Sequence, residues 1–564
     1  MTGLEPSLKL VGLGVSPGLA AGNAWVFNHD PWEGRRGNVD DAPRERLTVR
    51  QQHAQIEHAV EEAQADLQAT ARRTETELDA ATADIFRAQA AILSDPLLLE
   101  EIQKGLAEGR HDAEAVVQRV FKRWEHKFRT MDAELLRDRA DDIADLRRRL
   151  LWILAGAGTR AHAHALQNVP PGSVLVAARL LPSDTVCLSR RSVVAVVVEW
   201  GGRLSHAAIL TRQLGIPAVS RIDEAIHRIR PADRVLVDGT RGTVVVRPDE
   251  MTDGRFTRRI ERHRARSADA CRRCREPART LDGLLVRVEA NICSLEDACA
   301  AAANGADGIG LYRIEGLYLS RRRPPSEDEL LVCLRDALEP LKDKPVTVRL
   351  LDAGGDKPLA FARFAPEPDP ALGRRGVRLL LEYPELLNTQ LRALLRLARD
   401  HTVRILIPMV TLAEEMLEVK RILREAARDI SAEGLPPLGA MIETPAAALS
   451  ADQIAQHADF LSVGTNDLTQ YTMAAGRENT LVSRYFVDDH PAVLKLLELV
   501  ADAAGDLPLS LCGELAGRKR AVPRLVELGF GALSVPPSAI PEVKAEIRRI
   551  RLPQHQHPQA VPVE

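Results

Sequence analysis

The chain has 564 residues, of which 27% are charged, and a formal net charge of -3 at pH 7. A chain of this length is expected to form several domains, and its near-neutral charge argues against broad electrostatic binding to nucleic acid or to an anionic membrane. The longest apolar run, residues 193–198, is too short to span a bilayer, and the first ten residues lack the basic and then apolar regions of a signal peptide. We therefore expect a cytoplasmic protein with no membrane or nucleic-acid partner.

The seven cysteines are scattered along the chain and show no disulfide framework, which fits a reducing compartment. Cys271 and Cys274 form a CxxC pair, but no second Cys or His pair lies at zinc-finger spacing. We interpret this pair as two thiols on one helix face rather than as a metal site.

The N-terminal half alternates between α/β and helical character. Residues 1–26 combine apolar residues with Gly and Pro in the manner of strands and turns. From about residue 44 to 155, Gly and Pro are rare and apolar residues recur at steps of three and four, which predicts a bundle of amphipathic helices. The α/β character resumes at Pro170 and continues to about Val246, so a helical module is predicted inside an α/β domain.

The C-terminal half has the pattern of a (β/α)8 barrel. Residues 250–280 are charged and helix-compatible, and make a plausible linker. Beyond them, short apolar strands alternate with helical stretches, in the number and total length of such a barrel. The eight strands are expected in the segments LVRVEAN, GIGLYR, TVRLLD, RILIPMV, LGAMIET, FLSVGTND, LSLCGE and ALSVPP.

A histidine motif follows a buried strand in the segment VVVEWGGRLSHAAILTRQLGIPA. Gly201 and Gly202 permit a tight turn, and Ser205 is suited to cap a helix that begins at His206. The positive end of the helix dipole lowers the pKa of a histidine there and favours a phosphoryl dianion placed on it, which Arg212 could help to hold. From these residues alone, a surface histidine at a helix start remains the alternative.

Charged or reactive residues follow several predicted barrel strands, where (β/α)8 enzymes place their chemistry. Arginines bind phosphate and carboxylate, two carboxylates on adjacent strands can hold Mg²⁺, and a thiol can supply a proton. This combination suits a small, highly anionic substrate. The residues are Arg313, Arg349, Asp352, Glu443, Asn466, Asp467, Cys512 and Glu514.

The motifs occur in one order along nearly the whole chain: GVSPGLAAG, LLPSDT, GGRLSHAAI, GLYRIE, RLLDAGGDKP, ALGRRGVR, MIETPAAA, VGTNDLTQYTMAAGR and LCGELAG. In this order they resemble the Enzyme I family of the bacterial phosphotransferase system, the phosphoenolpyruvate–protein phosphotransferases. These belong to the wider group of phosphoenolpyruvate-utilising enzymes.

The resemblance implies a multidomain α/β fold in which a swivelling phosphohistidine domain carries an inserted helical bundle and precedes a C-terminal (β/α)8 TIM-type barrel. Residues 1–30 and 165–248 would form the phosphohistidine domain, and residues 31–164 would form the inserted helical domain that binds the phosphocarrier HPr. Residues 249–280 would be a helical linker. Residues 281–552 would form the phosphoenolpyruvate-binding barrel, and residues 553–564 a disordered tail.

The resemblance also implies roles for individual residues. His206 would be the phosphorylated nucleophile, supported by Thr185 and Arg212, and would pass the phosphoryl group to HPr in the first step of sugar uptake. Relatives form homodimers through the barrel, and a dimer is expected here.

In the barrel, Glu443 and Asp467 would ligate Mg²⁺, and Cys512 would protonate the enolpyruvate carbon as pyruvate forms. The residues implied in substrate binding are Arg313, Arg349, Lys357, Arg375, Asn466, Asp467 and Arg477.

The chain departs from the family pattern at Leu181, Ile314, Leu350 and Arg374. These changes remove hydroxyls and add a charge near the site, but they spare every group that is assigned a chemical step. A change in the turn at Ser534 leaves the dimer contact less well defined.

Two other functions compete with this interpretation. A pyruvate phosphate dikinase-like enzyme shares the histidine motif and the barrel but needs an ATP-grasp domain, and the residues before His206 show no Gly-rich nucleotide loop. A non-catalytic phosphoenolpyruvate sensor would not need the full set of reactive residues.

Overall fold

The computed structural model describes residues 7–27, 47–77, 80–108, 112–130, 134–156, 166, 169–186, 188, 192–202, 205–319, 321–354, 359, 361–362, 367, 369–477, 479, 482 and 484–552. The chain divides into two compact units, residues 1–263 and 264–564. Within the described ranges, no helix is long and apolar enough to cross a membrane.

The first unit is built on an eight-stranded mixed sheet in the order β1-β8-β7-β3-β4-β5-β6-β2. Val174 and Val176 belong to one buried cluster, whereas Leu175 and Ala177 belong to another, so the sheet is covered on both faces. Burial on both faces explains why the strands are almost uninterrupted apolar runs. The strands are β1 (Leu8–Val11), β2 (Leu13–Ser16), β3 (Leu19–Phe27), β4 (Ser173–Ala177), β5 (Val193–Val198), β6 (Ala218–Ser220), β7 (Arg234–Asp238) and β8 (Thr243–Val246).

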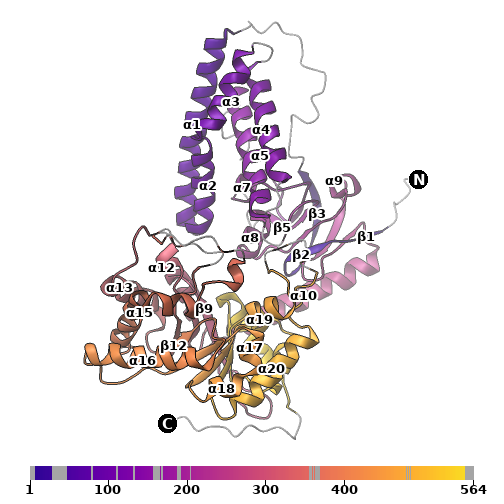
Figure 1. The fold of residues 1–564 in the computed structure, drawn as a ribbon. Helices are drawn as coiled ribbons and strands as arrows, with labels where there is room; N and C mark the ends of the chain where they lie inside the picture. Colours follow the sequence, from indigo (N-terminus) through magenta and orange to yellow (C-terminus); the bar gives the residue numbers. More distant parts are fainter. Residues whose placement is uncertain are drawn as a thin grey trace. The chain divides into compact units, whose positions relative to one another are not determined.

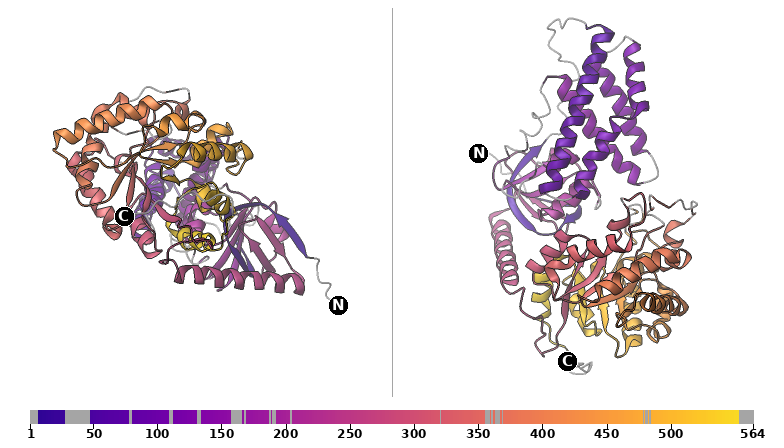
Figure 2. Two further views of the ribbon diagram at one scale, coloured as in Figure 1. Left: turned by 90° about the horizontal axis from the view of Figure 1, so that it is seen from below. Right: turned by 90° about the vertical axis from the view of Figure 1, so that its left-hand side faces the viewer.

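A helical bundle is inserted between β3 and β4, as the sequence predicts. Helix α1 packs against α2 and α5, and α4 packs against α5, so the long helices lie side by side (Figure 1, Figure 2). Asp95 caps α3 by accepting a hydrogen bond from the Leu97 amide at 2.8 Å, and Pro96 occupies the first turn. The helices are α1 (Val49–Glu77), α2 (Ala80–Ile92), α3 (Pro96–Ala107), α4 (Ala113–Arg129) and α5 (Glu134–Leu154).

In the described ranges, four further helices belong to the first unit or lead into the second. The division between the units falls within the last of them, α10, which covers most of the predicted linker. They are α7 (Pro182–Val186), α8 (His206–Gln213), α9 (Ala225–Arg228) and α10 (Glu250–Arg272).

The second unit contains a closed barrel of eight parallel strands in which β16 pairs with β9. Each strand arises from one of the eight predicted segments, so the predicted barrel is confirmed. The strands are β9 (Arg287–Ile292), β10 (Ile309–Arg313), β11 (Val346–Arg349), β12 (Val403–Ile407), β13 (Leu438–Ile442), β14 (Phe460–Val463), β15 (Leu509–Leu511) and β16 (Ala532–Val535).

Helices follow the barrel strands and bury their apolar faces with them in one continuous core. Ser326 and Glu329 form a capping box at the start of α13, which fixes where that helix begins. The helices are α11 (Leu295–Ala303), α12 (Gly316–Leu319), α13 (Glu327–Leu338), α14 (Val377–Glu382), α15 (Pro384–Leu397), α16 (Ala413–Asp429), α17 (Pro445–Leu449), α18 (Ala451–Ala455), α19 (Thr465–Thr472), α20 (Pro491–Ala504), α21 (Val522–Glu527) and α22 (Ile540–Ile547).

Leu67→Ala is expected to destabilise the helical bundle, because the Leu67 side chain is 0% exposed in its core. Losing a buried leucine side chain costs about 2–5 kcal/mol. Thermal unfolding followed by circular dichroism should show a lowered melting temperature. Leu97→Ala is the control, since Leu97 is 63% exposed on α3. Equal melting of the two variants would contradict the packing described.

Candidate active site in the barrel mouth

A pocket of about 330 Å³ opens at the carboxyl ends of the barrel strands. Arg313 and Arg349 end β10 and β11, while Glu443 and Cys512 directly follow β13 and β15. The predicted site residues that line the pocket are Arg313, Arg349, Arg375, Glu443, Asn466, Asp467, Arg477 and Cys512. Lys357 lies outside the described residues.

Asp352 holds two arginines in the pocket. Its carboxylate accepts two hydrogen bonds from Arg375, from Nε at 3.1 Å and from Nη2 at 2.7 Å. It also lies 3.3 Å from Nη1 of Arg349. Glu315 accepts a hydrogen bond from Nη2 of Arg349 at 2.6 Å and another from the Asp352 amide at 3.1 Å. All four side chains are buried, so their geometry is fixed by charge-assisted bonds that water screens little.

Arg375 is also linked to the predicted metal-binding edge. Its Nη1 lies 3.4 Å from Oδ1 of Asp467 and 3.2 Å from the hydroxyl of Tyr471. That hydroxyl donates to the carbonyl of Ala371 at 2.6 Å. Tyr471 therefore fixes the far side of a guanidinium that Asp352 already holds.

Two other arginines supply positive charge to the pocket. The Nε of Arg313 is buried and has no hydrogen-bond partner among the residues that the structure describes. Burial, and then the nearby charge of Arg349, lowers the pKa of Arg313. Arg477 is exposed, and no ion pair joins its side chain to the described part of the chain. An anion in this pocket would stabilise both guanidinium groups.

Glu443 and Asp467 follow adjacent parallel strands, β13 and β14. Oε1 of Glu443 accepts a hydrogen bond from the Met409 amide at 2.7 Å. Burial, and then the charges of Asp467 and Asp352, raises the pKa of Glu443, whereas Arg349 opposes this shift. Two carboxylates that repel each other in a buried site fit a divalent cation, which would offset their charge.

The protein offers this cation few ligands of its own. Among the residues with a described placement, no group of three or more His, Cys, Asp or Glu side chains could hold a metal. Glu443 and Asp467 stay the predicted protein ligands, with the other positions left to water and substrate oxygens, as is usual for Mg²⁺.

Cys512 lines the pocket with a buried thiol that is 3% exposed. Its Sγ accepts a hydrogen bond from the Ser462 hydroxyl at 3.5 Å and donates to the Val463 carbonyl at 3.5 Å. Burial raises the pKa of the Cys512 thiol, although the Ser462 hydrogen bond opposes the shift. The group is therefore a protonated acid at neutral pH, which suits a proton donor.

The predicted histidine motif belongs to the first unit. His206 is the first residue of α8, and Ser205 caps that helix by accepting a hydrogen bond from the Ala208 amide at 3.3 Å. Gly201 has a φ of +142°, and a Cβ there would lie 3.2 Å from Oγ of Ser205, so glycine suits the turn. The side chain of His206 is outside the described residues.

The two supporting residues predicted for His206 differ in position. Thr185 lies on α7, which packs against α8, and its side chain is not among those described. Arg212 is in the last turn of α8, where its Nε donates to the Ala208 carbonyl at 3.1 Å. A rise of about 1.5 Å per residue separates Arg212 from the start of α8 by about 9 Å along the axis. Both roles remain predictions.

The sequence did not reveal every residue that shapes the pocket. Two residues that were not predicted bind arginines of the pocket, namely Glu315 and Tyr471. Two others that were not predicted line the pocket, namely Gln470 and Asn479. Glu315 and Gln470 lie inside the motifs GLYRIE and VGTNDLTQYTMAAGR, so the motif strings contained a signal. A sequence motif does not show which partner each side chain contacts in the folded protein.

The fold and pocket define a barrel protein whose pocket is lined by arginines, carboxylates and a thiol. Comparison with known families agrees. Residues 267–552 match the family described as "PEP-utilising enzyme, PEP-binding domain", residues 11–139 match "PEP-utilising enzyme, N-terminal", and residues 169–242 match "PEP-utilising enzyme, mobile domain".

Similar curated proteins are named phosphoenolpyruvate-protein phosphotransferase. The protein from Geobacillus stearothermophilus is 36% identical over 96% of this chain and 93% of its own length. The one from Haloferax volcanii is 39% identical over 88% of this chain and 86% of its own. A solution structure titled as Enzyme I covers 45% of this chain and 99% of its own, with 27% identity and a TM-score of 0.35. The identity and coverage of the two curated relatives, together with the three family matches, show that the chain belongs to the phosphoenolpyruvate-protein phosphotransferase family of PEP-utilising enzymes, which confirms the resemblance of its motifs.

Iodoacetamide at pH 8 is expected to alkylate Cys271 much faster than Cys512. Cys271 is exposed, whereas Cys512 is buried and its pKa is raised, so little of it is the reactive thiolate. Peptide mass spectrometry would give both rates, and unfolding in urea should make them similar. Equal rates in the native protein would contradict the protonated thiol.

Proposed function

We propose that this chain transfers the phosphoryl group of phosphoenolpyruvate to His206 and then to a histidine of the phosphocarrier HPr, releasing pyruvate. The observation that supports this most is that one pocket gathers arginines, three carboxylates and a buried thiol, in a chain of this family. By analogy with sugar uptake, the reaction would be the first step of a phosphotransferase system.

The substrate is a small molecule with a phosphate, a carboxylate and an enol ester. Arg313 and Arg477 have charge available for its anionic groups, while Arg349 and Arg375 are preoriented by Asp352. Preorientation lowers the entropy that binding would otherwise cost, because the guanidinium groups do not need to be ordered again. The side-chain amide of Asn466 and the side chain of Lys357 would complete the contacts.

The chemistry is an in-line displacement at phosphorus. Neutral imidazole of His206 attacks with Nε2, an N–P bond forms, and the bond between phosphorus and the enol oxygen breaks. The electron pair released forms the enolate of pyruvate. Cys512 then gives its proton to the terminal carbon of the enolate, and the thiolate recovers a proton from solvent. Magnesium held by Glu443 and Asp467 would offset charge on the phosphoryl oxygens.

His206 and the barrel pocket belong to different units, so the proposed reaction requires the two to meet and then separate. The connection through α10 is where we place the main hinge. We place HPr docking on the helical bundle, expect homodimers through the barrel, and expect the protein to act in the cytoplasm.

The two competing functions give different outcomes in one assay. A pyruvate phosphate dikinase-like enzyme would label His206 in an ATP-dependent manner. A non-catalytic sensor would bind phosphoenolpyruvate without passing label to HPr.

Incubation with ³²P-labelled phosphoenolpyruvate and Mg²⁺ should label the protein with an acid-labile, base-stable phosphoryl group. His206→Ala should abolish the label, and Cys512→Ala should slow pyruvate release while phosphohistidine still forms. His227→Ala is the matched control, since His227 lies on α9 and is not part of the histidine motif in the sequence. Full labelling of His206→Ala would refute the proposed nucleophile.

Arg313→Gln should raise the KM for phosphoenolpyruvate by about 10-fold to 100-fold, because a hydrogen bond to a charged group contributes about 1.5–3 kcal/mol. Steady-state pyruvate release gives the KM. Arg335→Gln is the control, since Arg335 is 47% exposed on α13 and pairs with Asp400. A KM that both substitutions leave unchanged would remove Arg313 from the site.

A further inference from the structure

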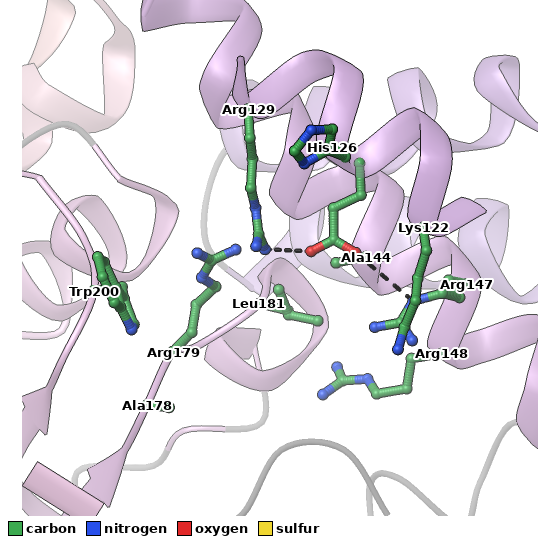
Figure 3. A pocket seen from close by; sticks show the side chains of 11 residues that line it. Lys122, His126, Arg129, Ala144, Arg147, Arg148, Ala178, Arg179, Leu181 and Trp200 are labelled. Atoms are coloured by element: carbon green, nitrogen blue, oxygen red, sulfur yellow. Dashed lines mark hydrogen bonds and ion pairs between the residues drawn. The ribbon is translucent and has the colours of Figure 1, made fainter. Parts of the chain in front are cut away.

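A second pocket, of about 390 Å³, lies wholly within the first unit. Helices α4 and α5 form one side, and the segments that follow β4 and β5 form the other. Figure 3 shows the guanidinium ends of Arg129 and Arg179 pointing toward one another, with Trp200 on the same side as Arg179. We call this cavity the arginine pocket. Its charged lining residues are Lys122, Glu125, Arg129, Arg147, Arg148 and Arg179, with His126 beside them.

Positive charge exceeds negative charge on the lining of the arginine pocket. Glu125 is the one carboxylate among the described residues that line it, and both Arg129 and Arg147 pair with it. Arg179 pairs with Asp141 at 2.6 Å, and Asp141 is not a lining residue. Lys122 has no ion pair with any residue of the described ranges.

Arg148 has a different role, because Asp145 and Asp184 hold it at 2.9 Å and 3.0 Å in a fully buried cluster. We assign it to the structure that joins α5 to α7. The other cations on the pocket lining are Lys122, Arg129, Arg147 and Arg179, and each of these three arginines already pairs with at least one carboxylate.

The ordinary explanation for such a cluster is a solvated network of surface ion pairs. Two of the arginines argue against it, because the side chains of Arg147 and Arg179 are 9% and 21% exposed, whereas Arg129 and Lys122 lie at the exposed rim. Water screens the charges of Arg147 and Arg179 weakly. Burial, and then the charge of Arg179, lowers the pKa of Arg129, and the charges of Glu125 and Asp141 oppose the shift. The guanidinium groups thus repel each other around a space large enough for a ligand.

We propose that the arginine pocket binds a phosphate-type dianion, distinct from the substrate of the barrel. Guanidinium groups bind phosphate through paired, charge-assisted hydrogen bonds. Trp200 is 64% exposed and adds a flat apolar surface, which favours a phosphate carried on an organic group over the free ion.

Two sources could present this dianion. One is a free phosphorylated small molecule, which would make the pocket a regulatory site. The other is the phosphoryl group on His206, since Trp200 lines the pocket and precedes His206 by six residues in the sequence.

The test is calorimetric titration of the full-length protein with pyrophosphate in the absence of Mg²⁺. Arg313→Gln serves as the parent, since it weakens anion binding in the barrel. Adding Arg129→Gln should weaken the remaining binding by about tenfold, the effect of losing one hydrogen bond between charged groups. Adding Arg123→Gln should leave it unchanged, because Arg123 is 63% exposed on the same helix and pairs with Glu101 outside the pocket. Thermal melting of each variant checks that the fold is retained.

Equal affinity of the Arg129 and Arg123 variants, or no binding to the Arg313→Gln parent, would overturn the proposal. This arm does not depend on the proposed phosphotransfer. A second arm separates the two sources and uses the chain with Arg313 intact. This chain and its His206→Ala variant are both treated with phosphoenolpyruvate and Mg²⁺ and then titrated with pyrophosphate. If phosphohistidine occupies the pocket, the treatment would block Arg129-dependent binding in the chain that keeps His206 but not in His206→Ala. A free occupant would leave the two alike.

Discussion

The carboxylate of Asp352 is the interaction on which the barrel site depends. It binds Arg375 through two nitrogens and lies beside Arg349, and it therefore brings together guanidinium groups that would otherwise repel each other. Because the cluster is buried, removing one partner would leave an uncompensated charge, which costs far more than a surface ion pair contributes. The barrel places this carboxylate three residues after the end of β11, at the edge where the other strands also end.

The same organisation explains how cations and carboxylates coexist in one pocket. Arg313 and Arg349 lie at the ends of β10 and β11, whereas the carboxylates of Glu443 and Asp467 follow β13 and β14. Arg375 connects the two groups through its contact with Asp467. A substrate that carries several negative charges and a divalent cation would complete both sides at once. Burial raises the pKa of the Cys512 thiol, which favours its protonated form on the pocket lining. Each property follows from the position of a side chain at a strand end.

The barrel and the inserted bundle were predictable because periodicity reports burial: each strand is a short apolar run, and each bundle helix shows an apolar stripe. The residues that follow the strands were predictable for the same reason, since their position in the barrel is fixed by the strand before them. Pairing was not predictable. Asp352 meets Arg375 across two loops, and Arg129 approaches Arg179 from separate elements. Sequence spacing carries no information on such contacts, so the arginine pocket had no signal in the motifs.

The central claim is that Asp352 organises the arginines for the substrate. The most direct test is calorimetric titration of phosphoenolpyruvate with Mg²⁺ into Asp352→Asn in a His206→Ala background, which prevents turnover. The account predicts that affinity falls by at least about tenfold, since the amide carries no charge to hold Arg375 and Arg349. Asp336→Asn, an exposed change on α13, should have no effect. Unchanged affinity in Asp352→Asn would contradict the account.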